Sequence, residues 1–397
     1  MDKCKIVIGG DISPTESNHK LFESGNVKLL LKNMLNTFNS SDLNVINLEC
    51  PLLTEKNPID KIGINLGANI KCVKFLKNAN ISVVNLGNNH TMDHGRKGIK
   101  STIKVLQEND IDFLGIGENI DDANRICLKE INNIKIGIIS IAETGFYTAN
   151  SNKFGTSNIN VIDIYNEIMH KRKECNFIIA LIHGGIEHYP YPSPQGQKLS
   201  RFLIDIGIDC IIWQHSHCPG YIEKYNEKFI VYGQGNFIFD MGKMNPDWYK
   251  GYLVELNLKR YNKERIETTF NIIPYIQSFE NNGIYLLEGN MKNKFVDEIF
   301  SEIQNLSNNE YIENKWNEFC YKNKDWYLSE LVGYKKSYHK MDIENDNKLI
   351  EDDSNDLNID KDIILKLRNL ILNESHYEMI KSSIELYINQ DKTIKKL

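Results

Sequence analysis

The sequence has no long uncharged hydrophobic run. No apolar stretch approaches the roughly 20 residues that a membrane-spanning helix needs, and the apolar run near residue 6 is much shorter than the hydrophobic region of a secretion signal. The runs at 177–182 and 210–213 have the length of buried strands. The sequence therefore predicts no membrane span, and we expect the protein to be cytoplasmic.

An excess of basic residues is also absent. Lys and Arg together number 47 against 53 Asp and Glu, which gives a formal net charge of −6. Non-specific binding to nucleic acid needs a basic surface, so nucleic acid is not an expected partner. Hydrophobic residues (41%) and charged residues (25%) lie in the normal globular range, which excludes disorder, collagen and coiled coil as descriptions of the whole chain.

The eight cysteines include no C-x-x-C pair. Most of them lie in apolar runs, where a thiol behaves as a small hydrophobic side chain. Neither a zinc ribbon nor a disulfide scaffold fits this pattern, so we expect reduced, structural cysteines.

The sequence does contain an alternation of short apolar strands and longer helical patterns, from the N-terminus to about residue 240. Strands that are apolar along nearly their whole length are buried on both faces, which favours a largely parallel sheet covered by helices. Such strands are expected at 5–8, 43–48, 81–86, 135–141, 177–182, 210–213 and 229–232. The segments 252–258 and 268–273 alternate in polarity, and we expect them to be antiparallel strands of a second sheet. The predicted fold class is α/β.

The pattern becomes helical beyond about residue 290. We therefore expect an α/β domain at 1–290 and a helical C-terminal region at 291–397. An acidic, Asn-rich stretch near 342–360 has the composition of a solvated loop within this region.

Six of the ten histidines fall in three short segments, and each segment follows the end of an expected strand. Two acidic residues follow the first two strands in the same way. In open α/β sheets the carboxyl ends of parallel strands bring together side chains that are distant in sequence, and ligand sites form there. The residues at these strand ends are Asp11, Glu49, Asn89, His90, His183, His215 and His217.

This set of side chains predicts a metal site. Carboxylate, amide oxygen and imidazole without thiolate suit divalent cations such as Mn²⁺, Fe²⁺, Zn²⁺ or Mg²⁺. A bridging carboxylate with further ligands on each side fits two metal ions about 3.5–4 Å apart that activate water and hold a phosphoryl oxygen. Taken singly, His183 would more often be a hydrogen-bonded structural residue, and Gly10-Asp11 a turn. Their joint placement at five strand ends favours the metal site.

The same residues carry a family resemblance between about residues 4 and 240. The motifs are, in order, Gly10-Asp11, Asn47-Leu48-Glu49, Asn88-Asn89-His90-Thr91-Met92-Asp93, His183-Gly184-Gly185, Gln214-His215-Ser216-His217 and Gly235-Asn236-Phe237. This order resembles the bacterial capsule synthesis family known as CapA or PgsA, the poly-γ-glutamate synthesis accessory proteins. That family resembles the calcineurin-like metallophosphoesterases. The resemblance implies a metallophosphoesterase-like α/β sandwich with a helical C-terminal region.

Carried over residue by residue, the resemblance implies two divalent metal ions. Asp11 would bind the first metal, Glu49 would bridge, Asn89 and His183 would bind the second, and His215 and His217 would bind one each. His90 would contact the substrate oxygen or protonate the leaving group. Asp93 would orient its imidazole.

Four parts of the sequence depart from the family pattern, and one of them is Gly233-Gln234, which stands where the family has Ser-Leu before Gly-Asn-Phe. Ser13 stands where metallophosphoesterases have a histidine two residues after the first aspartate, which leaves the first metal short of a ligand. Gly184 replaces the tryptophan that usually follows the strand-end histidine, and Gln214 replaces the glycine before the paired histidines. These changes leave the other ligands in place but alter the pocket wall.

The expected function is a metal-dependent hydrolase, phosphoesterase-like, in the synthesis of capsule, poly-γ-glutamate or surface polysaccharide. The biological role rests on the resemblance alone. A competing hypothesis, which Ser13 favours, is a non-catalytic scaffold whose metals bind a polyanionic polymer or its synthetase. A third is an amide hydrolase that cleaves the polymer. The expected partners are the polymer or a phosphoester substrate, and a polymer synthetase complex.

Metal content tests whether the strand ends converge. The purified protein is expected to contain divalent metal. The His183→Ala, His217→Ala double variant is expected to lose it, because both imidazoles are predicted ligands of one site although they come from different strand ends. Elemental analysis of both proteins measures this. Unchanged metal in the folded double variant would contradict the predicted site.

Overall fold

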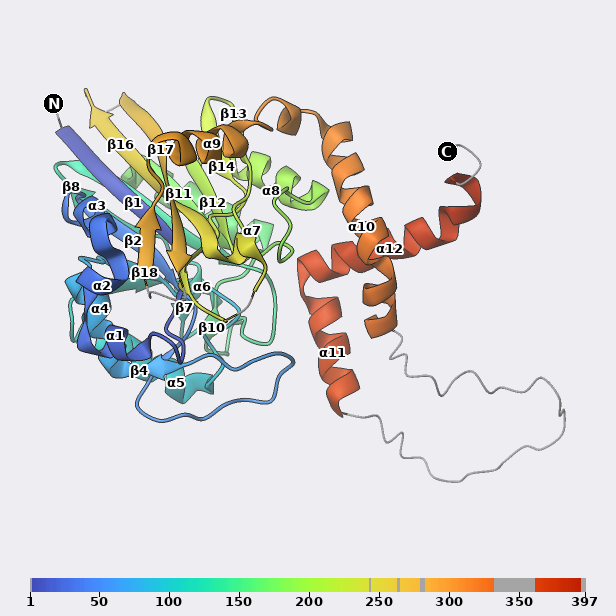
Figure 1. The fold of residues 1–397 in the computed structure, drawn as a ribbon, viewed down its shortest axis with the longest axis horizontal. Helices are drawn as coiled ribbons and strands as arrows, with labels where there is room; N and C mark the ends of the chain where they lie inside the picture. The colour runs from blue at the N-terminus through green and yellow to red at the C-terminus, as the bar shows by residue number, and fades with distance from the viewer. Residues whose placement is uncertain (1, 243, 263–264, 279–282, 332–360, 394–397) are drawn as a thin grey trace, which may run out of the picture. The chain divides into compact units, whose positions relative to one another are not determined.

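The computed structural model describes residues 2–242, 244–262, 265–278, 283–331 and 361–393 (Figure 1). It has two compact units: Met1–Ile59 with Asn65–Glu313, and Asp60–Ile64 with Asn314–Leu397. The first unit thus runs to Glu313, and the domain boundary expected near residue 290 stays a prediction. The acidic stretch near 342–360 lies outside the described residues.

The first sheet of the larger unit has eight strands and is built around β1. Its order is β18-β17-β16-β1-β2-β5-β6, and β15 also pairs with β1. The strands are β1 (Asp2–Ser13), β2 (Leu43–Leu48), β5 (Val83–Asn85), β6 (Asp112–Leu114), β15 (Asn236–Phe239), β16 (Lys250–Arg260), β17 (Ile266–Ser278) and β18 (Gly283–Leu286). The segments expected at 252–258 and 268–273 are antiparallel strands, but their assignment to a second sheet is wrong. They join the first sheet because β16 pairs along β1 from residue 2 to residue 8.

The second sheet has six strands in the order β13-β14-β12-β11-β9-β8. They are β8 (Cys127–Ile131), β9 (Ile134–Ala142), β11 (Phe177–His183), β12 (Cys210–Gln214), β13 (Ile222–Tyr225) and β14 (Lys228–Val231). The four inner strands β9, β11, β12 and β14 are parallel. Every residue of β11 is buried, as its continuous apolar sequence predicts. Two small ladders, β3 (Leu52–Leu53) with β4 (Ala68–Asn69) and β7 (Ile116–Gly117) with β10 (Gly155–Thr156), lie outside these sheets.

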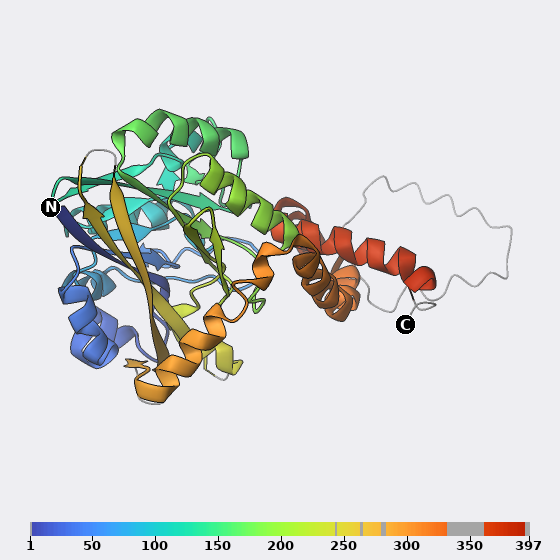
Figure 2. The ribbon, with the colours of Figure 1, turned by 90° about the horizontal axis from the view of Figure 1, so that it is seen from above.

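The two sheets pack face to face, and helices cover their outer faces (Figure 2). Ile8 and Val45 of the first sheet share one apolar cluster with Ile138 and Leu181 of the second. The helices α1 (His19–Ser24), α2 (Val27–Leu31), α3 (Leu35–Asn39), α4 (Val73–Asn78) and α5 (Gly95–Gln107) cover the first sheet, whereas α7 (Val161–Lys171) and α8 (Pro194–Asp205) cover the second. The predicted α/β sandwich is confirmed.

The remaining helices are α6 (Ile120–Ala123), α9 (Gly289–Phe300), α10 (Asn309–Leu331), α11 (Lys361–Leu372) and α12 (Glu374–Thr393). The last three confirm the helical C-terminal region. Within the described part of the chain, every helix is too short or too polar to cross a membrane.

A close backbone approach next to β1 positions the site. A Cβ atom added at Gly10 would lie 2.2 Å from the carbonyl oxygen of Gly235, so only glycine fits there. This approach lets β15 pair with the end of β1 and places Asn236 opposite Asp11.

The helix α9 contributes to the core between the sheets, and this can be tested by mutation. Phe295 is buried in that cluster and its ring lies edge-on to Tyr252. Phe295→Ala is expected to lower the free energy of unfolding by about 3 kcal/mol because it leaves a cavity. Met291→Ala, at an exposed position of the same helix, should change it by less than about 0.5 kcal/mol. Urea unfolding compares the two; equal effects would show that α9 is not part of this core.

Candidate metal centre

The predicted ligands come together at one edge of the sandwich, where the parallel strands end. Asp11 lies near the end of β1, and the backbone N–H of His215, just after β12, donates a hydrogen bond to its Oδ2 atom at 3.2 Å. Nε2 of His183, the last residue of β11, lies 3.4 Å from Oε1 of Glu49 and 2.9 Å from Oδ1 of Asn89. The rings of His183 and His215 are 4.9 Å apart. Residues separated by up to about two hundred positions in the sequence thus share one site.

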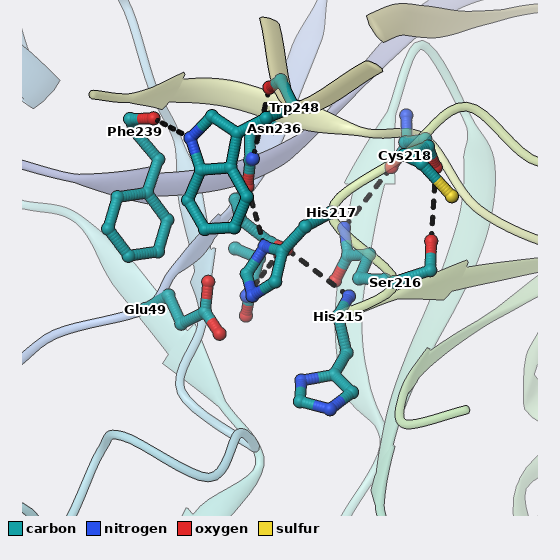
Figure 3. Close-up of polar contacts among 12 residues, drawn as sticks. Glu49, His215, Ser216, His217, Cys218, Asn236, Phe239 and Trp248 are labelled. Carbon is teal, nitrogen blue, oxygen red and sulfur yellow. Dashed lines mark hydrogen bonds and ion pairs between the residues drawn. The ribbon is translucent and has the colours of Figure 1, made fainter. Parts of the chain in front are cut away.

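Three of these side chains form a group that could hold a cation. Ligand atoms of Glu49, His215 and His217 all lie within 4.8 Å of one another (Figure 3). Glu49 is fully buried, and among the described residues neither of its oxygens meets a hydrogen-bond donor in good geometry. A buried carboxylate in this condition costs free energy that a bound cation would offset. One carboxylate and two imidazoles therefore fit a divalent metal ion.

The ionisation of Glu49 is consistent with a ligand. Burial raises the pKa of this carboxyl, but the imidazoles of His217, His183 and His90 outweigh burial and lower its pKa to about 2. The carboxylate is therefore negatively charged at neutral pH.

A tight turn aims the two imidazoles of His215 and His217 at one site. Both residues have positive φ angles, +93° and +53°, which are uncommon for residues other than glycine. Such a backbone persists only where the surrounding contacts hold it. Here Asp11 accepts the N–H of His215, and the hydroxyl of Ser216 donates to the carbonyl of Cys218 at 3.0 Å.

The orientation of His217 is fixed by two residues for which the sequence predicted no role (Figure 3). Oδ1 of Asn236 lies 2.8 Å from Nδ1 of His217, and the indole of Trp248 packs against the imidazole with a centroid distance of 4.4 Å. With the Nδ1 proton donated to Asn236, Nε2 is the ring atom that can bind a cation. Burial lowers the pKa of His217, but Glu49, Glu187 and Asp11 and the contact with Asn236 raise it overall.

The sequence contained a signal for the role of only one of these two residues. Asn236 belongs to a motif at a strand start, so its place near the site could have been inferred. Trp248 lies in the short 3-10 helix η4 (Pro246–Tyr249), and only the tertiary fold brings it to His217.

A hydrogen-bonded chain runs through three further predicted ligands. The amide Nδ2 of Asn47 lies 2.7 Å from Oδ1 of Asp11 and 3.2 Å from Nδ1 of His183. His183 in turn contacts Asn89. Asn47 is a third residue without an assigned role, although it lies in the Asn47-Leu48-Glu49 motif.

His90 and Asp93 lie together beside this centre. Nδ1 of His90 is 2.7 Å from Oδ2 of Asp93, which is fully buried and also accepts the backbone N–H of Leu66 at 2.7 Å. The His90 side chain is partly buried, and it lies near enough to Glu49 to lower the pKa of that carboxyl.

The structure adds Glu143, which directly follows β9 and is buried. Its Oε1 accepts the N–H of Gly185 at 3.0 Å. A Cβ atom at Gly184 would lie 2.4 Å from the Cγ atom of Glu143, so this carboxylate takes space that a larger residue at 184 would need. Its position after a strand end is a signal that the sequence contained. Ser13, another departure from the family pattern, is fully buried.

Comparison with known proteins agrees with the sequence motifs. The family described as "Bacterial capsule synthesis protein PGA_cap" matches residues 5–241. A capsule biosynthesis protein CapA of Bacillus anthracis is 30% identical over 251 residues, 61% of this chain and 61% of that protein. The PGA biosynthesis protein CapA of Bacillus subtilis (strain 168) is 30% identical over 272 residues, 66% of this chain and 69% of that protein. The matched region thus spans about three fifths to two thirds of these relatives.

Solved structures show a weaker similarity. A 5'-nucleotidase precursor from Thermus thermophilus is 12% identical, with a TM-score of 0.41, and the match covers 71% of this chain and 56% of that chain. At this TM-score the similarity supports no inference about activity.

The environment of Asp11 predicts a pH dependence of stability without metal. Burial, and then the charge of Glu49, raise the pKa of Asp11 from 3.8 to about 6. The unfolded chain releases this proton at a lower pH than the folded chain does, so Asp11 lowers stability as pH rises from 4 to 6. A shift of this size corresponds to at most about 3 kcal/mol.

The measurement is urea unfolding with a chelator between pH 4.5 and 7. Relative to Asp11→Asn, the wild type is expected to lose stability as pH rises. The difference in slope is the readout, because Asn also changes the contact with the N–H of His215. Parallel pH profiles would contradict the raised pKa.

Proposed function

The chain belongs to the bacterial capsule synthesis protein family, and from this we propose that it is a metal-dependent hydrolase of phosphoester type, acting in the synthesis of capsule or poly-γ-glutamate. The observation that supports the chemistry is the buried carboxylate of Glu49, to which no donor among the described residues makes a hydrogen bond in good geometry, and which lies close to His215 and His217. These three side chains would hold a divalent cation. When bound, such a cation lowers the pKa of water and polarises a phosphoryl oxygen.

His90 has the properties of the general acid. Its contact with Asp93 holds Nδ1, so Nε2 is the atom that would deliver a proton to the leaving-group oxygen. Asp93 is itself held by the N–H of Leu66, which restricts the rotation of the imidazole. His90 is partly buried beside the centre, where an incoming substrate can contact it.

The second hypothesis is a non-catalytic scaffold, in which the metal binds carboxylates of a polyanionic polymer or contacts its synthetase. Ser13 supports it, because a buried serine provides no imidazole where metallophosphoesterases have one. Amide hydrolysis of the polymer would use the same residues and differs only in the bond cleaved. A polymer synthetase is the proposed partner in each case.

His90 decides between enzyme and scaffold. His90→Ala is expected to keep the metal but to lose about 10²–10⁴-fold in rate, since general acid catalysis contributes that much. Asp93→Asn should lose less, because the imidazole remains but is less well held. The assay is hydrolysis of p-nitrophenyl phosphate and bis-p-nitrophenyl phosphate with Mn²⁺ or Zn²⁺. His170→Ala, at an exposed position on α7, is the control and should match the wild type.

The scaffold hypothesis makes the opposite prediction. Metal-loaded wild type would then be no faster than His90→Ala on these esters or on poly-γ-glutamate. That result would exclude both hydrolase hypotheses for these substrates.

A further inference from the structure

We propose that the centre binds one divalent cation rather than two, at Glu49, His215 and His217, and that Asp11 is a positioning residue and not a ligand. This inference rests on the proposed metal centre and revises the pair of metals implied by the family resemblance. It follows from which polar groups at the site already satisfy one another.

Three of the six predicted ligands belong to a complete hydrogen-bonded chain. The two N–H groups of the Asn47 amide point to Oδ1 of Asp11 and Nδ1 of His183. The amide oxygen of Asn47 accepts from Asn88 at 3.2 Å. Nδ1 of His183 is then an acceptor, so the proton lies on Nε2, which donates to Oδ1 of Asn89. The Asn47 amide and the His183 imidazole thus both donate to acceptors within this chain.

This arrangement leaves no place for a second cation at His183 and Asn89. A neutral imidazole has one lone pair, and in His183 the Asn47 amide occupies it. Binding a metal there would require breaking the contacts of His183 with both Asn47 and Asn89. Glu49 differs, because among the described residues no donor makes a hydrogen bond in good geometry to its buried oxygens, and Nε2 of His183 lies 3.4 Å from Oε1.

Asp11 has a structural task that accounts for its burial. Its Oδ1 accepts from Asn47 at 2.7 Å and its Oδ2 accepts the N–H of His215 at 3.2 Å. The second contact holds the turn in which His215 has a φ of +93°. Asp11 thereby fixes the direction in which the two imidazoles point without binding the cation.

A second cation beside Asp11 would also lack ligands. Zinc and similar ions in proteins take at least four ligands, of which about three come from the protein. The resemblance would supply a histidine two residues after Asp11, but Ser13 is there. His217 donates its Nδ1 proton to Asn236, so it has only Nε2 to offer, and the first cation uses that atom.

The test counts metal ions on the full chain and asks whether they are paired. The protein is loaded with Mn²⁺, excess metal is removed, and elemental analysis gives the equivalents per chain. Electron paramagnetic resonance distinguishes an isolated Mn²⁺ from an exchange-coupled pair. We expect one equivalent and the spectrum of isolated ions.

Variants assign the ligands. Glu49→Gln should lose the cation. Asn89→Ala should keep one equivalent, and Asp11→Asn should keep one with about 10–100-fold weaker affinity, because the His215 turn loses its acceptor. Asn89 is only half-buried, so its variant decides the question if Asp11→Asn does not fold.

Two tightly bound equivalents with a coupled spectrum would overturn the proposal, and so would retention of the cation by Glu49→Gln. Loss of all metal from folded Asn89→Ala would overturn it as well. The outcome is separable from that of the hydrolase proposal. One bound cation without hydrolysis would contradict only the hydrolase, and two cations with hydrolysis would contradict only this inference. A wild type that binds no Mn²⁺ would contradict both.

Discussion

The pairing of β1 with two parallel neighbours decides where the chemistry of this molecule lies. Asp11 stands in register with Asn47 of β2 on one side and with Asn236 of β15 on the other. Asn47 contacts His183, and Asn236 contacts His217, so both amides link the first sheet to residues of the second. A shift of one residue in either ladder would turn these side chains to the opposite face of the sheet. The close contact between Gly10 and Gly235 makes this register sterically possible.

Two buried carboxylates show how strongly local surroundings govern charge at this edge. Asp11 and Glu49 are both almost completely buried, yet the pKa of Asp11 is raised to about 6 and that of Glu49 is lowered to about 2. Burial raises both values. Three imidazoles act on Glu49 and outweigh burial, whereas Asp11 also experiences the charge of Glu49. A cation that binds only the native state would offset this unfavourable burial and stabilise the fold.

The departures from the family pattern have local explanations in this structure. Gly184 leaves room for the carboxylate of Glu143, which holds the backbone of Gly185. Gln214 has a structural role as well, since its amide donates to the carbonyl of Gly9 and to Oε1 of Gln234. These contacts tie the strand before the paired histidines to β1. A carboxylate, that of Glu143, thus takes the space next to Gly184, and an amide, that of Gln214, stands where the family pattern has glycine.

Much of this architecture was readable from the sequence, because it depends on local patterns. Continuous apolar runs identified the buried strands, and the polar residues just after them identified the edge where Asp11, Glu49, His183 and the paired histidines meet. The motif order was enough to indicate the family. The helical character of the C-terminal region followed from its periodicity in the same way.

Only the tertiary structure shows which of these residues contact one another. Local periodicity does not specify long-range pairing, and so the strands near 252–258 and 268–273 were assigned to the wrong sheet. Trp248 reaches His217 only through the path of the chain after β15. Asn47 stands between Asp11 and His183 because two strands from different sheets end side by side. Its hydrogen bonds, to residues 36 and 136 positions away in the sequence, exist only once that register is formed.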